Sequence, residues 1–437
     1  MTSKPDALAA LLRGEWRDPE SGAPINLPSL AIAIERSLAG SEADLVEPLR
    51  LGRRLAVVSD PATRAVLGGR VERALARVAS IEPVILDAEP HADASTVAAL
   101  RRASVSADAL VAVGSGTIND LCKYAAAQDG KPYAVFATAP SMNGYTSKNA
   151  AITVDGHKKT LPAALTRGVF MDLEILAAAP ARMIRAGLGD SMCRSTAQAD
   201  WLLSHHLFAT PYREAPFALL ADDEPALLDD PEALLRKDLD AMRALARTLI
   251  LSGLGMTICD GSYPASQGEH LISHYIDMQS PSYRASYFHG EQVGVATLTM
   301  ARIQETVLVG GPPQLQRDAI SESELQRRFG ADVGASCWHE FDRKRLTGDR
   351  LASVQRHIDT RWDEIRSSVR RAMIPVARIH QVLGRANCAE TASDIGVDDA
   401  FYAKAVRDAR FLRDRYTFLD LAADSQHRDL VNTKLAA

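Results

Sequence analysis

Carboxylate and imidazole side chains that could bind a metal lie in three short segments of this 437-residue sequence. Asp190 ends the segment GLGD, His270 and His274 stand four residues apart in EHLISH, and His289 opens HGEQ. Residues four apart on a helix share one face, so His270 and His274 could approach one ligand. A catalytic zinc site needs about three protein ligands and an open position for substrate. Asp190, His270 and His289 meet that requirement, although only the fold can bring them together.

Each of these residues also has an ordinary structural explanation. Asp190 is suited to cap a helix that we expect at 191–207, because Asp is a preferred N-cap residue. Two histidines on one helical face are more often not a metal site, and His289 could simply open a helix at 290–306. The residue pattern alone leaves the metal site and the structural explanation open.

Two further motifs could bind a phosphate-containing ligand. GSGTIND begins at Gly114, after an apolar run, and its glycines let backbone amides approach a phosphate at a helix N-terminus. It lacks the third glycine of the dinucleotide fingerprint, so a tight turn is an equally good explanation. TAPSMNG follows another apolar run, and Thr138, Ser141, Asn143 and the nearby Ser147 could bind a ligand or stabilise a turn.

Strands alternating with helices must position these motifs in the first part of the chain. Short apolar runs alternate with helical segments at 64–79 and 96–103, which predicts a parallel sheet covered by helices on both faces. Asp155-Gly156 predicts the tight turn of a β-hairpin. The expected strands are 55–59, 83–86, 109–113, 133–138 and 168–173, with a hairpin of 151–154 and 157–161.

The second part of the chain has a different pattern. Beyond Pro180 strand signals nearly vanish, and long segments have the apolar spacing of helices. We therefore expect two domains, an α/β domain at 1–182 and a helical domain at 183–437. The segment 221–232, ADDEPALLDDPE, is expected to be an acidic surface loop.

Composition excludes several classes of protein. With 50 Lys+Arg against 55 Asp+Glu the net charge is −5, so a strongly basic nucleic-acid binder is not expected. The five cysteines are scattered and never form a C-x-x-C pair, which indicates reduced thiols and no cysteine-based zinc site. We find no signal peptide and no run of about 18 apolar residues, so we expect a cytoplasmic protein without a membrane span.

Taken together, the motifs resemble those of a known family. GSGTIND, TAPSMNG, GLGD, GEHLISH and HGEQVGVAT occur in the order found in sn-glycerol-1-phosphate dehydrogenases, and the chain looks most like their bacterial branch. That group is part of the superfamily of iron-containing alcohol dehydrogenases, glycerol dehydrogenases and dehydroquinate synthases. The resemblance runs from about residue 55 to 415–422. It implies a Rossmann-like α/β nucleotide-binding domain followed by an all-α, dehydroquinate synthase-like domain.

The resemblance also implies roles for individual residues, by their positions in the motifs. It assigns NAD(H) or NADP(H) to Gly114, Ser115, Gly116, Thr117, Asp120, Thr138, Ser141 and Ser147, with Asp60 near the adenosine ribose. It assigns one divalent metal to Asp190, His270 and His289. It assigns substrate contacts to Asn143, Asp190 and His274, of which Asp190 and His274 are catalytic.

Two positions depart from the family pattern. An acidic residue often stands at the place of Asn143, where it touches substrate hydroxyls. The iron-dependent alcohol dehydrogenases have a further histidine ligand four residues after the aspartate, and this chain has Arg194 there. We therefore expect a three-ligand site with zinc or nickel in preference to iron.

The activity that the resemblance implies is reversible, NAD(P)H-dependent reduction of dihydroxyacetone phosphate to sn-glycerol 1-phosphate, a step of phospholipid metabolism, by a homodimer. Lys148 and Lys158 are candidates for holding the substrate phosphate. Alternatives are a glycerol or polyol dehydrogenase with an unphosphorylated substrate, and a dehydroquinate synthase-like lyase. A catalytically silent nucleotide- or sugar-phosphate-binding protein is the alternative outside enzymes.

Overall fold

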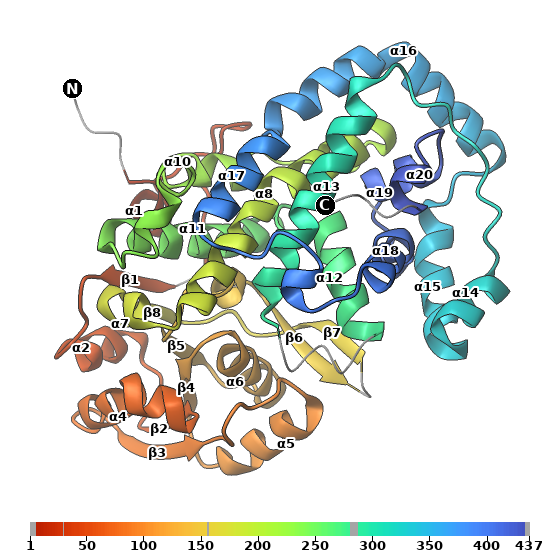
Figure 1. Ribbon diagram of the computed structural model, residues 1–437. Coiled ribbons are helices and arrows are strands. Elements are labelled where there is room, and N and C mark those ends of the chain that lie inside the picture. The colour runs from red at the N-terminus through yellow and green to blue at the C-terminus, as the bar shows by residue number, and fades with distance from the viewer. Residues whose placement is uncertain (1–5, 29, 155–156, 280–286, 433–437) are drawn as a thin grey trace, which may run out of the picture. The chain divides into compact units, whose positions relative to one another are not determined.

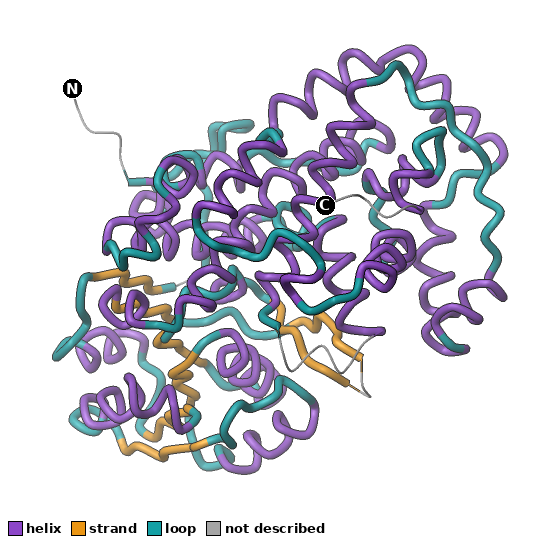
Figure 2. The backbone as a smooth tube through the Cα atoms, in the orientation of Figure 1, coloured by secondary structure: helices purple, strands orange, loops and turns teal. Residues whose placement is uncertain are grey.

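The computed structural model describes residues 6–28, 30–154, 157–279 and 287–432. The chain divides into two compact units, Met1–Ser191 with Glu214–Gly261, and Met192–Arg213 with Ser262–Ala437. All strands of the described residues belong to the first unit, and Figure 2 draws them in orange. The expected domain boundary at 182/183 stays a prediction.

A parallel six-stranded sheet with the order β1-β8-β5-β4-β2-β3 forms the centre of the first unit. Strands β4 and β5 are buried along their whole length, as expected for parallel strands covered on both faces. The expected parallel α/β sheet is confirmed, and β1, a partly buried edge strand, is an addition to it. The strands are β1 (Ala31–Glu35), β2 (Arg54–Ser59), β3 (Ser80–Ile85), β4 (Ala109–Gly114), β5 (Tyr133–Ala137) and β8 (Gly168–Asp172).

Helices cover both faces of this sheet (Figure 1). Helices α2 (Glu42–Val46) and α4 (Gly69–Leu75) lie on one face, and α5 (Ala94–Ala103) and α6 (Gly116–Asp129) lie on the other. On the α4 side, Val71 and Leu75 belong to the same buried cluster as Val57 and Val111. The expected helix at 64–79 begins instead as a π-helical turn, η2 (Arg64–Gly68), before α4.

The order of the strands marks one end of the sheet as a ligand site. Strand β2 pairs with both β3 and β4, so the chain changes its direction of travel across the sheet between β2 and β4. Ligands of open parallel sheets bind beyond the carboxyl ends of the strands at such a point. Val58 pairs with Ala112, which puts Asp60 level with Gly114, and Gly114 in turn pairs with Ala137 of β5.

The rest of the first unit is a hairpin and further helices. The hairpin pairs β6 (Asn149–Val154) with β7 (His157–Pro162), and its predicted Asp155-Gly156 turn lies outside the described residues. The expected acidic loop at 221–232 is wrong in part, because it contains α10 and η4. The helices are α1 (Ala7–Leu12), η1 (Glu47–Leu49), α3 (Pro61–Thr63), η3 (Gly144–Thr146), α7 (Leu173–Ala178), the start of α8 (Ala181–Phe208), α9 (Ala215–Leu220), α10 (Glu224–Asp229), η4 (Pro231–Ala233) and α11 (Leu239–Ile258).

The second unit is helical throughout its described residues, which confirms the expected all-α C-terminal region. Leu271 and Tyr275 of α12 are buried in one apolar cluster with Val295 and Met300 of α13. No helix of the described residues is long and apolar enough to cross a membrane. Besides the rest of α8, the helices are α12 (Gly268–Gln279), α13 (His289–Val309), α14 (Glu322–Phe329), α15 (Ala331–Lys344), α16 (Gly348–Ala372), α17 (Val376–Arg385), η6 (Ser393–Ile395), α18 (Asp399–Asp408), η7 (Ala409–Leu412), α19 (Phe418–Ala423) and α20 (Asp429–Asn432).

Candidate functional site

The turn between β4 and α6 has the features of a phosphate-binding helix start. Gly114 ends β4, Ser115 is the N-cap residue, and Gly116 and Thr117 open the 14-residue helix α6. The Ser115 side chain makes no capping hydrogen bond, so no N-cap side chain occupies the first N–H groups of this helix. Those N–H groups and the positive end of the helix dipole suit an anion.

The TAPSMNG loop lies directly beside this turn. The backbone N–H of Thr138 donates to the carbonyl of Gly114 over 3.1 Å. A Cβ atom added at Gly116 would lie 2.9 Å from Sδ of Met142, so the Met142 side chain packs directly against this turn. Ser141 is buried in the same loop. The structure therefore brings two of the predicted cofactor motifs together at the carboxyl end of the sheet.

Asp60 lies at the same end, but its carboxylate is engaged. It caps α3 by accepting the backbone N–H of Thr63 over 2.7 Å, and Thr63 Oγ1 donates to it over 3.0 Å. The residue therefore has a local structural role as a helix cap, worth about 1 kcal/mol.

Asp120 is likewise engaged, in joining α6 to the hairpin. Its carboxylate accepts the backbone N–H of Ala151 over 3.0 Å and the side-chain amide of Asn119 over 3.0 Å. Asp120 therefore fixes the hairpin against the start of α6, which is a structural task next to the predicted pyrophosphate position.

A buried lysine that we did not predict holds the loop containing Ser147. Lys123 Nζ donates to the carbonyls of Gly144 over 2.5 Å and Asn149 over 3.1 Å, and lies 3.4 Å from Ser147 Oγ. Burial lowers its pKa to about 8, against the opposing charge of Asp120. The sequence feature that could have indicated this buried lysine is its position three residues after Asp120, in an otherwise apolar stretch of helix.

Asn143 and Asp190 are in contact within the first unit. The backbone N–H of Asn143 donates to a carboxylate oxygen of Asp190 over 2.8 Å, and its side-chain amide lies 3.3 Å from Ser252 Oγ. Asp190 is fully buried. The contact depends on Gly187, where a Cβ atom would lie 1.7 Å from the carbonyl oxygen of Pro140.

The expected helix start at 191, with Asp190 as its N-cap, is wrong. Helix α8 begins at Ala181 and passes through Gly187 and Gly189 without interruption. The glycine at 187 serves the close approach of α8 to the TAPSMNG loop, and not a turn. Asp190 is therefore an interior helical residue, whose carboxylate faces the Asn143 loop.

Three imidazoles gather in the second unit. His270 and His274 lie one turn apart on α12, and His289 is the first residue of α13. The ring centroid of His289 is 5.1 Å from that of His270 and 6.2 Å from that of His274. Nδ1 of His289 lies 3.3 Å from Ser273 Oγ. The two segments EHLISH and HGEQ thus form one cluster, although 14 residues separate His274 from His289 in the sequence.

A buried carboxylate orients the first of these histidines. Glu269 Oε1 lies 3.0 Å from Nδ1 of His270 and also accepts the backbone N–H of Gln267, while Oε2 accepts Thr196 Oγ1 over 3.0 Å. Burial would raise the pKa of Glu269, but the hydrogen bond and charge of His270 outweigh burial and lower it. A carboxylate on Nδ1 makes Nε2 the ligating nitrogen, as in many metal sites.

Cys193 lies near this cluster and is another residue that we did not predict from the sequence. Its Sγ lies within 4.8 Å of a ring nitrogen of His270 and 3.5 Å from the carbonyl of Ala265. Asp190 precedes it by three residues on α8, so the two side chains lie on the same side of that helix. This spacing was the available signal.

Arg194 has a structural role. Its guanidinium donates to Gln198 Oε1 and to the carbonyl of Ala372, the last residue of α16, both over 3.0 Å. These hydrogen bonds join α8 to the end of α16. Arg194 therefore does not take the place of the fourth, histidine ligand of the iron-dependent enzymes.

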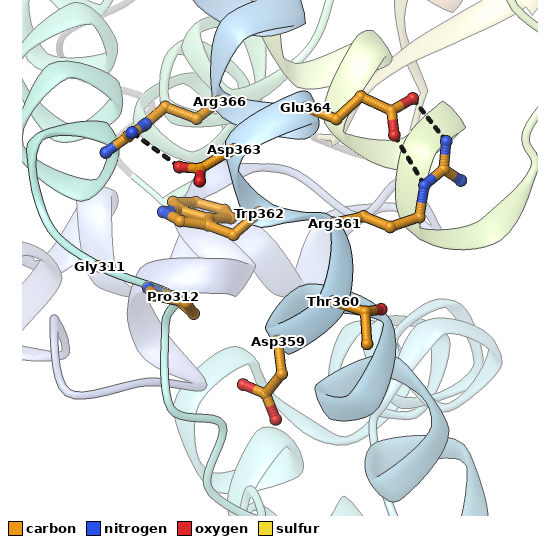
Figure 3. A pocket seen from close by; sticks show the side chains of 9 residues that line it. All are labelled: Gly311, Pro312, Asp359, Thr360, Arg361, Trp362, Asp363, Glu364 and Arg366. Atoms are coloured by element: carbon orange, nitrogen blue, oxygen red, sulfur yellow. Dashed lines mark hydrogen bonds and ion pairs between the residues drawn. The ribbon is translucent and has the colours of Figure 1, made fainter.

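A surface pocket of the second unit is lined by residues that belong to none of these motifs (Figure 3). It is formed where α16 passes Gly311 and Pro312. The charged side chains at its edge are paired with each other, Arg361 with Glu364 and Arg366 with Asp363. No sequence motif contributes to it, and we assign it no function.

Comparison with known proteins identifies relatives of the chain. The family model "iron-containing alcohol dehydrogenase" matches residues 33–180. Glycerol-1-phosphate dehydrogenase [NAD(P)+] of Bacillus licheniformis is 35% identical over 262 residues, 59% of this chain and 65% of the relative. The enzyme of the same name from Pyrococcus furiosus is 31% identical over 292 residues, 64% of this chain and 83% of the relative. The matched part of this chain thus spans just under two thirds of the Bacillus protein.

Solved structures share the fold over most of the chain. The archaeal halo-thermophilic Red Sea brine pool alcohol dehydrogenase ADH/D1 has a TM-score of 0.60 at 16% identity, and the match covers 95% of this chain and 99% of that one. At that identity the likeness concerns the fold alone.

Proposed function

Since the chain belongs to the glycerol-1-phosphate dehydrogenase family, within the superfamily of iron-containing alcohol dehydrogenases, we propose that it reduces dihydroxyacetone phosphate to sn-glycerol 1-phosphate, reversibly and with NAD(P)H. The observation that carries the proposal is the cluster of His270, His274 and His289, oriented by the buried Glu269. A protein that only binds a nucleotide has no need of such a cluster.

The proposal includes one divalent metal held by Asp190, His270 and His289. The donor chemistry fits, because a carboxylate and two imidazoles are the usual three-ligand set of a catalytic zinc site. The carboxylate of Glu269 on His270 Nδ1 fits as well, because metal-ligating histidines commonly donate to such a group. With arginine at 194, we favour zinc or nickel over iron.

The residues of this chain then divide the work of a hydride transfer. When bound, the metal supplies Lewis-acid polarisation of a ketone oxygen and the nicotinamide supplies a hydride. The amides at Gly114–Thr117 bind the cofactor pyrophosphate, and Thr138, Ser141 and Ser147 extend that site. His274 delivers the proton to the substrate oxygen, directly or through water, because an imidazole can both gain and lose a proton near neutral pH. Asn143 bonds a substrate hydroxyl.

A substrate panel tests the proposed reaction. The metal-reconstituted protein is assayed at the nicotinamide absorbance band with dihydroxyacetone phosphate, glycerol and glycerol 1-phosphate, each with NAD(H) and NADP(H). We expect turnover with the phosphorylated pair. Turnover with glycerol alone would select a polyol dehydrogenase, and nucleotide binding without turnover under any metal would select a silent binding protein.

Two variants test the residue roles. Asp190→Asn and His289→Ala are expected to lose metal and activity while they bind the dinucleotide as the wild type does, because the nucleotide residues lie in other segments. Normal activity of either variant after treatment with a chelator would contradict the assignment. Calorimetric titration with the dinucleotide serves as the control for folding.

We also propose that the protein is a cytoplasmic homodimer and that its small-molecule substrate is a phosphorylated triose or polyol. Its five cysteines are scattered and form no C-x-x-C pair, which supports a reducing compartment. Light scattering is expected to give twice the chain mass of 47.2 kDa, and a monomer mass at micromolar concentration would refute the dimer.

A further inference from the structure

Two arginines lie against the imidazole cluster within the second unit. Arg413 and Arg415 follow the short helix η7, and both reach Ser266: Arg413 Nη1 lies 3.4 Å from Ser266 Oγ, and Arg415 Nη1 lies 2.5 Å from the Ser266 carbonyl. Arg413 Nη2 also lies 3.2 Å from Nε2 of His274. The guanidinium groups of both arginines therefore reach Ser266, and that of Arg413 also contacts the imidazole that is proposed to contact substrate.

Arg415 is bonded only to neutral groups. Its Nη2 donates to Ser262 Oγ over 3.0 Å, and its guanidinium lies 4.1 Å from the ring centroid of Tyr263. It forms no ion pair with any carboxylate of the described residues. A partly buried cation without a counter-ion is costly, so such a position is retained where an anion completes it.

Three nearby acids of the described residues form ion pairs with cations other than Arg415. Asp420 and Asp424 bind Arg410, at 3.1 and 2.7 Å, and Asp414 binds Arg343 over 2.9 Å.

The pKa directions agree with this geometry. Burial, followed by the charge of Arg415, lowers the pKa of Arg413 to about 9. Burial also lowers the pKa of Arg415. Both groups remain charged at neutral pH, since a guanidinium keeps its proton in proteins.

The backbone around the pair is fixed. Lys344 Nζ, itself buried, donates to the carbonyl of Arg415 over 2.7 Å. Thr417 forms a capping box with Asp420 at the start of α19. The arginines therefore project from a rigid segment, as a preformed binding site requires.

We propose that Arg413 and Arg415 bind the phosphate group of the substrate, beside His274. This inference rests on the proposed function, which it extends by naming the residues that select a phosphorylated triose. Two guanidinium forks can each donate paired N–H groups to phosphate oxygens, which a lysine cannot do. Of the lysines predicted for this task, Lys148 instead pairs with Asp260 over 3.1 Å at the surface, and the side chain of Lys158 lies outside the described residues.

The test compares two substrates that differ only in the phosphate. Arg415→Gln, Arg415→Lys and the control Arg361→Gln, at an arginine that pairs with Glu364, are assayed as metal-loaded full-length proteins with dihydroxyacetone phosphate and with dihydroxyacetone. We expect Arg415→Gln to lower kcat/KM for the phosphorylated substrate on the order of 100-fold and to leave the rate with dihydroxyacetone unchanged. Arg415→Lys should recover part of this loss, and Arg361→Gln should resemble the wild type.

Equal losses on both substrates by Arg415→Gln and Arg415→Lys would show a structural role and overturn the proposal. So would an unchanged kcat/KM of Arg415→Gln for dihydroxyacetone phosphate. If the wild type reduces neither substrate, the proposed function fails, and calorimetric titration with inorganic phosphate still decides this inference. Binding by the wild type that Arg415→Gln abolishes supports it, and equal binding or none by both overturns it.

Discussion

The contact between Gly187 and Pro140 makes a sharp prediction, because two physical effects act there with opposite sign. Alanine in a helix interior is favoured over glycine by up to about 1 kcal/mol. At Gly187, however, the added Cβ atom would lie 1.7 Å from the Pro140 carbonyl oxygen. Real Cβ atoms keep at least 3.0 Å, so helix and loop must separate by 3.0 − 1.7 = 1.3 Å. The position of the Cβ atom is fixed by the helix backbone, and the atom it meets is a backbone oxygen, so no change of side-chain rotamer can relieve the contact.

Overpacking of this kind costs about 3 kcal/mol, the upper end of its usual range. The net effect of Gly187→Ala is therefore a loss of about 2 kcal/mol, or roughly 4–8 °C in Tm for a unit of this size. Gly69→Ala, in α4 of the same unit, is the matched control, because its nearest atoms would be Arg73 Nη1 at 3.4 Å and the Arg64 carbonyl at 3.6 Å. That variant should gain up to about 1 kcal/mol. Thermal unfolding followed by circular dichroism measures both, and a Gly187→Ala variant as stable as Gly69→Ala would refute the reasoning.

Three further predictions concern single side chains. Glu269→Gln removes the carboxylate on His270 Nδ1 and should weaken metal binding about 10- to 100-fold in competition with a chromogenic chelator; an unchanged affinity would count against an orienting role. Arg194→Gln should leave the metal content unchanged, because the guanidinium bonds Gln198 and Ala372, and loss of metal would show that it supports the site. Because burial lowers the pKa of Lys123 from 10.5 to about 8, the unfolded chain binds more protons between these pH values. The wild type should therefore gain about 3 kcal/mol of stability over Lys123→Met as pH rises through that window, and a constant difference in urea unfolding would contradict this.

The sequence was sufficient for the elements whose patterns are local. Strands such as β4 and β5 are continuous apolar runs because both faces are buried, and that burial is visible in composition. The EHLISH spacing likewise predicts two imidazoles on one helical face, and they lie one turn apart on α12.

Features that depend on tertiary contact were not predictable in this way. The sequence predicts that a helix starts only after Gly187 and Gly189, because a sequence shows that glycine is present but not which atom approaches it. Lys123 and Arg415 look like ordinary surface cations. Only the packing around them shows that Lys123 bonds three loop oxygens and that Arg415 forms no ion pair with a carboxylate of the described residues.

The central claim is that the imidazole cluster holds a metal that the NAD(P)H-dependent reduction requires. One rate tests this claim most directly. It is the initial rate of NAD(P)H oxidation with dihydroxyacetone phosphate, measured on one preparation before chelation, after chelation and after zinc or nickel is returned. We predict that chelation abolishes the rate and that one of these metals restores it. A rate that chelation leaves unchanged, or no consumption of NAD(P)H with either metal, would contradict the claim.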